Sequence, residues 1–136
     1  MSAPDPADRD QLRDQAEQAV LGGMLTDPTT IARVDDLLTP TDFYRPHHTT
    51  IYQTILTHHQ TGKPTDPLII GQTLLNTKTN LPEGLAYLVR CQHACPTPAN
   101  TTWYAHQVAE AAQARRLVEL ATRLHHAAQT DDPELA

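Results

Sequence analysis

The spacing of apolar residues predicts that most of the chain is helical, beginning with residues 15–26, QAEQAVLGGMLT. Apolar side chains recur there every three or four residues, as they do along one face of an α-helix. This face comprises Ala16, Ala19, Val20, Leu21, Met24 and Leu25. Gly22 and Gly23 lie inside it, and each costs about 1 kcal/mol relative to alanine. We therefore expect a second backbone to cross at the glycine pair; the alternative is that the helix ends at Gly22.

Prolines divide the following stretch into short elements. The first helix begins near residue 11 and ends at Asp27-Pro28, because the residue before a proline avoids the helical region. A second helix is predicted over residues 28–38, with its buried positions at Ile31, Val34, Leu37 and Leu38. In the connector that follows, Thr41 or Asp42 is expected to cap a single turn that places Phe43 in the core.

Two further helices have clear start or stop signals. Residues 46–61 begin with Pro46 and end before Gly62, a natural helix stop. The apolar stripe of this helix is Ile51, Tyr52, Ile55 and Leu56. Asp66 before Pro67 is typical of a helix start and predicts a helix to about residue 76. A β-strand over 68–70 is the rival interpretation, which the return of apolar residues one helical turn later disfavours.

The last part of the chain predicts a short helix and a very long one. The short helix starts within residues 81–84 and ends near Pro96, with Leu85, Leu88 and Val89 buried. The long helix covers residues 101–130. At 1.5 Å per residue it would measure about 45 Å and overhang a domain of this size. We therefore expect its second half to leave the domain and to pair with something else.

These elements give an all-α fold in three parts. Residues 1–11 are rich in proline and aspartate and predict a disordered leader. Residues 12–96 form a globular head of about six helices. Residues 97–136 form the long protruding helix, which is the first arm of an incomplete helical hairpin.

Composition and charge narrow the functional classes. The net charge is −6, with no basic stripe and few aromatic residues, so direct binding of nucleic acid by this segment is not expected. No apolar run is long enough to span a membrane, and the first residues do not resemble a signal peptide. The chain has two cysteines and no secretory signal, which is typical of a protein in a reducing compartment. The predicted location is the cytoplasm.

Catalytic and metal-binding motifs are not found. Gly62-Lys63 is followed by Pro64, so it is not part of a phosphate-binding loop. Cys91 and Cys95 are four residues apart and would supply at most half of a zinc site, with a histidine among the missing ligands. The simpler interpretation is that both are small buried residues. We therefore predict no catalytic residue, no cofactor and no metal site, and keep a zinc-binding helical protein as a remote alternative.

Five sequence blocks, in order, resemble the N-terminal domain of DnaB-type replicative DNA helicases. They are AEQAVLGGMLTDP, LTPTDFYRPHHTTIYQTI, GKPTDPLIIGQTL, LAYLVR and CPTPANTTWYAHQVAEAAQARRL. The likeness runs over about residues 17–124. Where the family has Gly-Gly ahead of the Tyr-Leu block, this chain has Glu83-Gly84.

The resemblance implies a non-catalytic, protein-interaction function in DNA replication. Domains of this family associate into a collar on a hexameric ring and contact the C-terminal domain of primase, while the ATPase motor is a separate domain. The implied partners are a second copy of the chain, as a homodimer or in a ring of dimers, the primase C-terminal domain, and a helicase loader. The implied location is cytoplasmic and nucleoid-associated. The alternative is a free-standing accessory or regulatory protein that binds a helicase ring.

Six residues are the candidates for these contacts. By its place in the Tyr-Leu block, Tyr87 is a candidate for partner binding, and a half-buried core tyrosine is the alternative. Val118 and Leu124 are partner-binding candidates on the long helix, with hairpin packing or dimer contact as the alternative. Trp103, Leu117 and Leu120 are the candidates for self-association.

Overall fold

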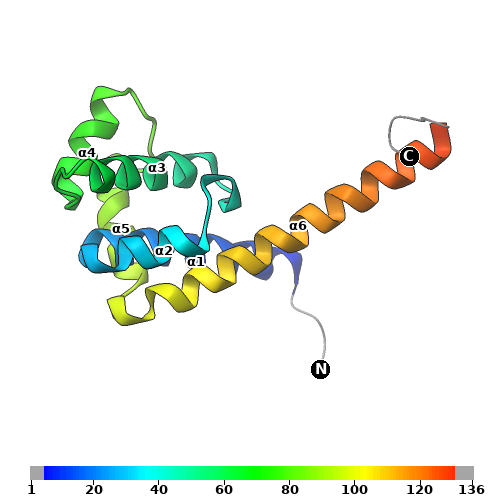
Figure 1. Ribbon diagram of the computed structural model, residues 1–136, viewed down its shortest axis with the longest axis horizontal. Coiled ribbons are helices and arrows are strands. Elements are labelled where there is room, and N and C mark those ends of the chain that lie inside the picture. Colours follow the sequence, from blue (N-terminus) through cyan, green and yellow to red (C-terminus); the bar gives the residue numbers. More distant parts are fainter. Residues whose placement is uncertain (1–4, 131–136) are drawn as a thin grey trace.

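The computed structural model describes residues 5–130, and every regular element within that range is a helix. The α-helices are α1 (Pro6–Thr26), α2 (Ile31–Leu37), α3 (Pro46–Gln60), α4 (Pro67–Asn76), α5 (Ala86–Ala94) and α6 (Thr101–Thr130). Three 3-10 turns connect them: η1 (Pro28–Thr30), η2 (Pro40–Asp42) and η3 (Pro98–Asn100). Figure 1 shows α1–α5 gathered in a globular head, from which the second half of α6 projects. The prediction of an all-α head with a protruding last helix is confirmed.

The first helix begins earlier than the sequence analysis predicts. The side chain of Asp5 accepts a hydrogen bond from the Ala7 amide, and Pro6 occupies the first helical position. An aspartate cap followed by proline is a strong helix start. The prediction of a disordered leader is therefore wrong for residues 6–11, which are helical. Residues 1–4 of that leader lie outside the described residues.

The glycine pair is the site of a close helix crossing, as predicted. A Cβ atom built on Gly22 would lie 1.8 Å from the carbonyl oxygen of Cys91 in α5. One built on Gly23 would lie 1.9 Å from Oγ1 of Thr101, the first residue of α6. The helix continues past both glycines to Thr26, so the alternative that it ends at Gly22 is wrong.

The other predicted helices differ from the structure mainly at their ends. The single helix predicted over 28–38 is a 3-10 turn followed by α2. Gly62 has a φ of +74°, which is the left-handed conformation expected of a glycine that ends a helix. Residues 68–70 are helical, so the β-strand alternative is wrong.

The fifth helix starts later and turns a different face inward. Glu83 and Gly84 both have positive φ values, 58° and 63°, so the backbone is not helical there and the helix begins only at Ala86. The buried side chains of α5 are those of Tyr87, Leu88 and Cys91. The prediction that Leu85 and Val89 are buried is wrong, because both are exposed.

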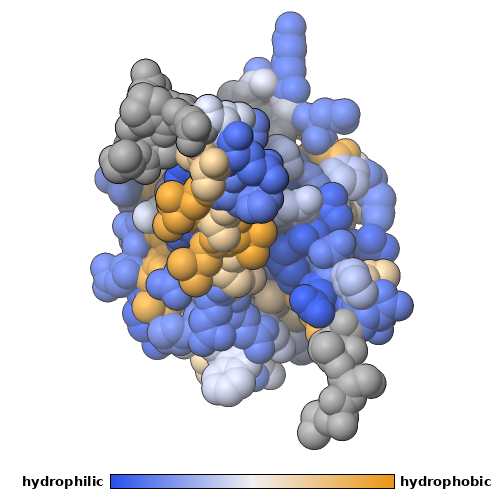
Figure 2. Space-filling view, turned by 90° about the vertical axis from the view of Figure 1, so that its right-hand side faces the viewer, coloured by the Kyte–Doolittle hydropathy of each residue, from blue (hydrophilic) through white to orange (hydrophobic). Residues whose placement is uncertain are grey.

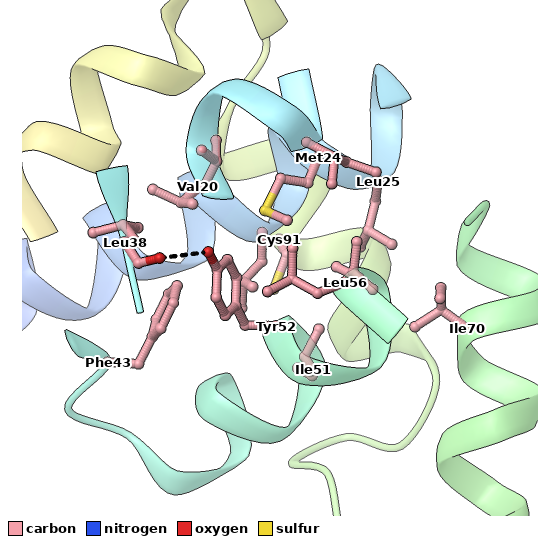
Figure 3. Close-up of a cluster of buried hydrophobic side chains, with 14 of the residues drawn as sticks. Val20, Met24, Leu25, Leu38, Phe43, Ile51, Tyr52, Leu56, Ile70 and Cys91 are labelled. Carbon is pink, nitrogen blue, oxygen red and sulfur yellow. Dashed lines mark hydrogen bonds between the residues drawn. The ribbon is translucent and has the colours of Figure 1, made fainter. Parts of the chain in front are cut away.

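The core lies between α1, α2, α3 and α5, with α4 and the start of α6 closing it (Figure 1). Its largest buried side chains include Tyr52, Leu21, Met24, Ile31, Ile51 and Ile55. Figure 3 shows Tyr52 near the centre of this cluster, with its hydroxyl donating to the carbonyl of Leu38 at 3.0 Å. The Phe43 ring lies 4.9 Å from that of Tyr52, so Phe43 is in the core, as predicted.

The helix crossing predicts a large effect of adding one methyl group. Gly22→Ala should destabilise the head by about 3 kcal/mol or more, because the new Cβ meets a backbone carbonyl that cannot move without shifting α5. Gly71→Ala is the matched control, since its Cβ meets only side-chain atoms, the flexible end of Leu85 at 2.8 Å and Cδ1 of Leu88 at 3.6 Å. Urea unfolding should show a change within about 1 kcal/mol for that control. Equal effects of the two substitutions would contradict the close crossing.

Candidate interaction surface

The first half of α6 packs on the head, and its second half does not. The buried residues of its first half, Thr101, Ala105, Val108 and Ala112, repeat at helical spacing along one face. From Arg116 to His126 every residue is exposed. We call residues 117–130 the rod.

The apolar residues of the rod lie on a different side of the helix from the face that packs on the head. At about 100° per residue, the two apolar faces are centred roughly 120° apart around the helix axis. Leu117, Leu120 and Leu124 form the outer face and are 67%, 43% and 50% exposed. We call these three residues the leucine face. Figure 2, in which the projecting half of α6 points toward the viewer, shows hydrophobic side chains gathered beside a hydrophilic region.

The leucine face has the spacing of a short coiled-coil seam. Its members are three and four residues apart, as at the a, d and a positions of a heptad repeat. Trp103 is fourteen residues before Leu117, so it lies on the same side of α6, and it is 67% exposed. The structure therefore places all three association candidates on one side of the helix.

The two partner-binding candidates on α6 do not share a face. Val118 is exposed, but it follows Leu117 directly and so points about 100° away from it. Leu124 belongs to the leucine face. A partner that contacts both residues has to wrap around the rod.

Tyr87 lies inside the head, at one end of a buried polar chain. Only 4% of its surface is exposed, and its hydroxyl is 2.5 Å from Nε2 of His48. His48 Nδ1 is in turn 2.7 Å from Oε1 of Glu17, and both of these residues are fully buried. This buried polar chain links α1, α3 and α5. Its members come from three of the sequence blocks quoted above, so residues far apart in sequence meet here.

The ends of this polar chain are also satisfied. Glu17 accepts hydrogen bonds from the amides of Tyr44, at 2.8 Å, and Arg45, at 3.3 Å. Gln18 donates to the Tyr87 hydroxyl at 3.2 Å. Burial raises the pKa of Tyr87 to about 12, so the hydroxyl keeps its proton at neutral pH. Buried polar groups that are fully paired fix the relative positions of the elements carrying them.

The sequence analysis missed this chain. One signal was available: a glutamate within the apolar face of the first helix requires a buried partner. The spacing of the residues does not reveal that His48 is that partner. The structure therefore gives Tyr87 a role inside the head, and its predicted contact with a partner stays a prediction.

The two cysteines are buried and not joined by a disulfide. Burial raises the pKa of the Cys91 thiol to about 12, whereas zinc binds the thiolate. Cys95 donates from Sγ to the carbonyl of Thr97 at 3.4 Å, and His93 is exposed. Among residues 5–130, no three His, Cys, Asp or Glu side chains are grouped as metal ligands would be. Over the same residues, none of the helices combines the length and apolar character needed to cross a membrane.

Comparison with known proteins identifies the domain. The family model described as the DnaB-like helicase N terminal domain matches residues 10–110. The chain belongs to this family. The replicative DNA helicase DnaB of Leifsonia xyli subsp. xyli is 40% identical over 110 residues, which cover 80% of this chain and 24% of that protein. The chain thus spans about a quarter of the length of this relative.

Two solved structures of DnaB N-terminal domains are similar to the chain. The domain from Mycobacterium tuberculosis has a TM-score of 0.76 at 40% identity, covering 85% of this chain and 84% of that one. The domain from Helicobacter pylori has a TM-score of 0.79 at 27% identity, covering 93% of this chain and 99% of that one. The family resemblance seen in the sequence is confirmed.

The buried polar chain predicts the effect of removing one hydroxyl group. Tyr87→Phe should lower the free energy of unfolding by about 1–3 kcal/mol, because it leaves the buried ring of His48 and the half-buried amide of Gln18 without their partner. Tyr104→Phe is the control, since the Tyr104 hydroxyl makes no hydrogen bond within the described residues. Urea unfolding measures both. If Tyr87→Phe lowers the free energy of unfolding no more than the control does, the buried polar chain contributes nothing to stability.

Proposed function

We propose that this chain is a non-catalytic protein-interaction module of the DNA replication machinery. The observation that carries the proposal is the leucine face, which is apolar, exposed and turned away from the head. The buried acidic and histidine side chains of the Glu17–His48–Tyr87 chain are occupied in holding the head together. In this proposal, ATP-driven unwinding belongs to parts of the longer relatives that this chain does not match.

The first proposed partner is a second copy of the chain. Fully burying a leucine contributes about 1.5–3 kcal/mol, so three half-exposed leucines on each of two copies supply about 6 kcal/mol. This burial is the driving force for a weak dimer, formed by packing two rods against each other; a dissociation constant of about 1 mM corresponds to about 4 kcal/mol. Such dimers would be the units of a ring of dimers, and a second hairpin arm in a longer chain would compete for the same leucines.

One substitution should separate self-association from folding. Leu120→Asp should abolish the dimer and leave the unfolding midpoint nearly unchanged, because Leu120 is exposed and outside the head. Thr122→Asp, on the opposite side of the rod, adds the same charge and should leave the dimer intact. Sedimentation equilibrium across micromolar to millimolar concentrations measures both. A wild-type chain that stays monomeric at millimolar concentration would overturn the proposed self-association.

The second proposed partner is the C-terminal domain of primase. The similar domain from Helicobacter pylori was described together with its interactions with primase. In this chain, Val118 and Leu124 are the exposed apolar residues we assign to that contact, while Tyr87 supports it from inside the head. A helicase loader is a further candidate for the same rod. These roles place the module in the cytoplasm, at the nucleoid.

Calorimetric titration with the primase C-terminal domain from the same genome tests this assignment. Val118→Asp should weaken binding at least tenfold, because it places a charge in an apolar contact. Gln53→Asp is the control, since it adds the same charge to an exposed position of α3, outside the rod. An absence of heat at high micromolar concentration would reject primase as a partner, and equal effects of the two substitutions would remove Val118 from the site.

A further inference from the structure

The rod leaves the head at a pair of arginines. Arg115 and Arg116 directly precede Leu117 and are the last residues of α6 with hydrogen bonds to the head. Both reach Asp42, at the end of η2. Arg115 donates from Nη2 to the Asp42 carbonyl at 2.8 Å, and Arg116 donates from Nη2 to the Asp42 carboxylate in an ion pair. We call these three residues the Asp42 clamp.

Asp42 is itself held firmly in the head. It is 6% exposed, and its Oδ2 accepts a hydrogen bond from the Thr39 amide at 2.8 Å. The next residue, Phe43, is buried against Tyr52 in the core. A side chain that binds Asp42 is therefore attached to a fixed point.

A second contact beside the clamp joins α6 to α1. The ring centroid of Tyr44 lies 5.4 Å from the guanidinium carbon of Arg115 and 3.7 Å from that of Arg13 in α1. Arg115 Nη1 is buried and has no hydrogen-bond partner among residues 5–130. The Arg115 side chain is therefore held by the Asp42 carbonyl and the Tyr44 ring.

The packing of α6 on the head is weak just where the rod begins. Between Thr101 and the rod its buried side chains are those of Ala105, Val108 and Ala112, and two of these three are alanines. The rod then extends about 21 Å beyond Arg116 at 1.5 Å per residue. A tilt of about 10° at its base would displace the tip sideways by about 4 Å, which is nearly half of the 8–10 Å between the axes of packed helices. An interdigitated leucine seam does not tolerate such a shift.

We propose that the Asp42 clamp is the positioning element that fixes the direction of the rod, so that the leucine face is pre-oriented for its partner. This inference rests on the proposed function of the rod. Pre-orientation strengthens association by reducing the freedom lost on binding. The clamp residues touch no partner themselves and act through the leucines.

The direction of the rod is measured first, in chains that cannot associate. Cysteines replace the exposed residues Gln53 in α3 and His125 in the rod, each carries a spin label, and Leu120→Asp keeps the chain monomeric. Native Cys91 and Cys95 are buried and stay unlabelled in the folded chain. The double substitution R115Q/R116Q should at least double the width of the distance distribution measured by pulsed electron resonance. An unchanged distribution overturns the inference.

The second measurement is the dimer dissociation constant of chains with an intact leucine face. R115Q/R116Q should raise it about two- to fivefold, in line with partly exposed ion pairs, and high salt should bring the wild-type chain toward the same value. R116K keeps the charge and should restore most of the affinity when Arg115 is present. R123Q is the control, because Arg123 lies on the rod and makes no ion pair with residues 5–130.

The two measurements separate this inference from the proposed function. A broadened distribution with a raised dissociation constant supports the clamp. A dissociation constant that R115Q/R116Q leaves equal to that of the R123Q control overturns it, while self-association stands. A wild-type chain that never dimerises overturns both the proposed self-association and the clamp's role in it, whatever the width of the distance distribution.

Discussion

The whole arrangement depends on the close crossing at Gly22 and Gly23. With no side chains there, α1 lies directly against the backbone of α5 on one side and against the first turn of α6 on the other. This contact makes α1 the central helix of the head and fixes where α6 begins. Glycine inside a helix costs about 1 kcal/mol, and here two glycines in a row are tolerated because no other residue permits this approach.

With α1 fixed in this way, its polar residues can reach partners on other elements. Glu17, one and a half turns before the glycines, binds His48 and the amides of residues 44 and 45. The same connector, at Asp42, receives the two arginines from α6. Residues 42–45 are therefore the place where α1, α3 and α6 are tied together by hydrogen bonds, close to the point where the rod leaves the head.

Elements whose start or stop signals lie in the local sequence could be predicted. Features that depend on residues far away in the sequence could not. The start of α3 at Pro46 and the full extent of α6 follow from proline, glycine and composition. The start of α1 was also local, but the acidic, proline-rich composition of residues 1–11 concealed the Asp5-Pro6 cap. The late start of α5 depends on a positive φ at Glu83, and a glutamate in the sequence does not predict a positive φ. The burial of Tyr87 depends on residues 39 and 69 positions away.

The position of the arginines in α6 follows from what each half of the helix has to do. If the apolar face of the first half continued past Ala112, it would pass through the positions of Arg116, Glu119 and Arg123. The rod would then bind apolar surfaces on the same side of the helix as the head. Polar residues at those positions prevent this, and the two arginines still attach the base of the rod through Asp42. Hydrogen bonds with fixed geometry define a direction, which non-directional apolar contacts do not. A helix that must stand away from its own domain is therefore best anchored by charged side chains at the point where it leaves that domain. Its leucines then lie on a side of the helix that does not face the head.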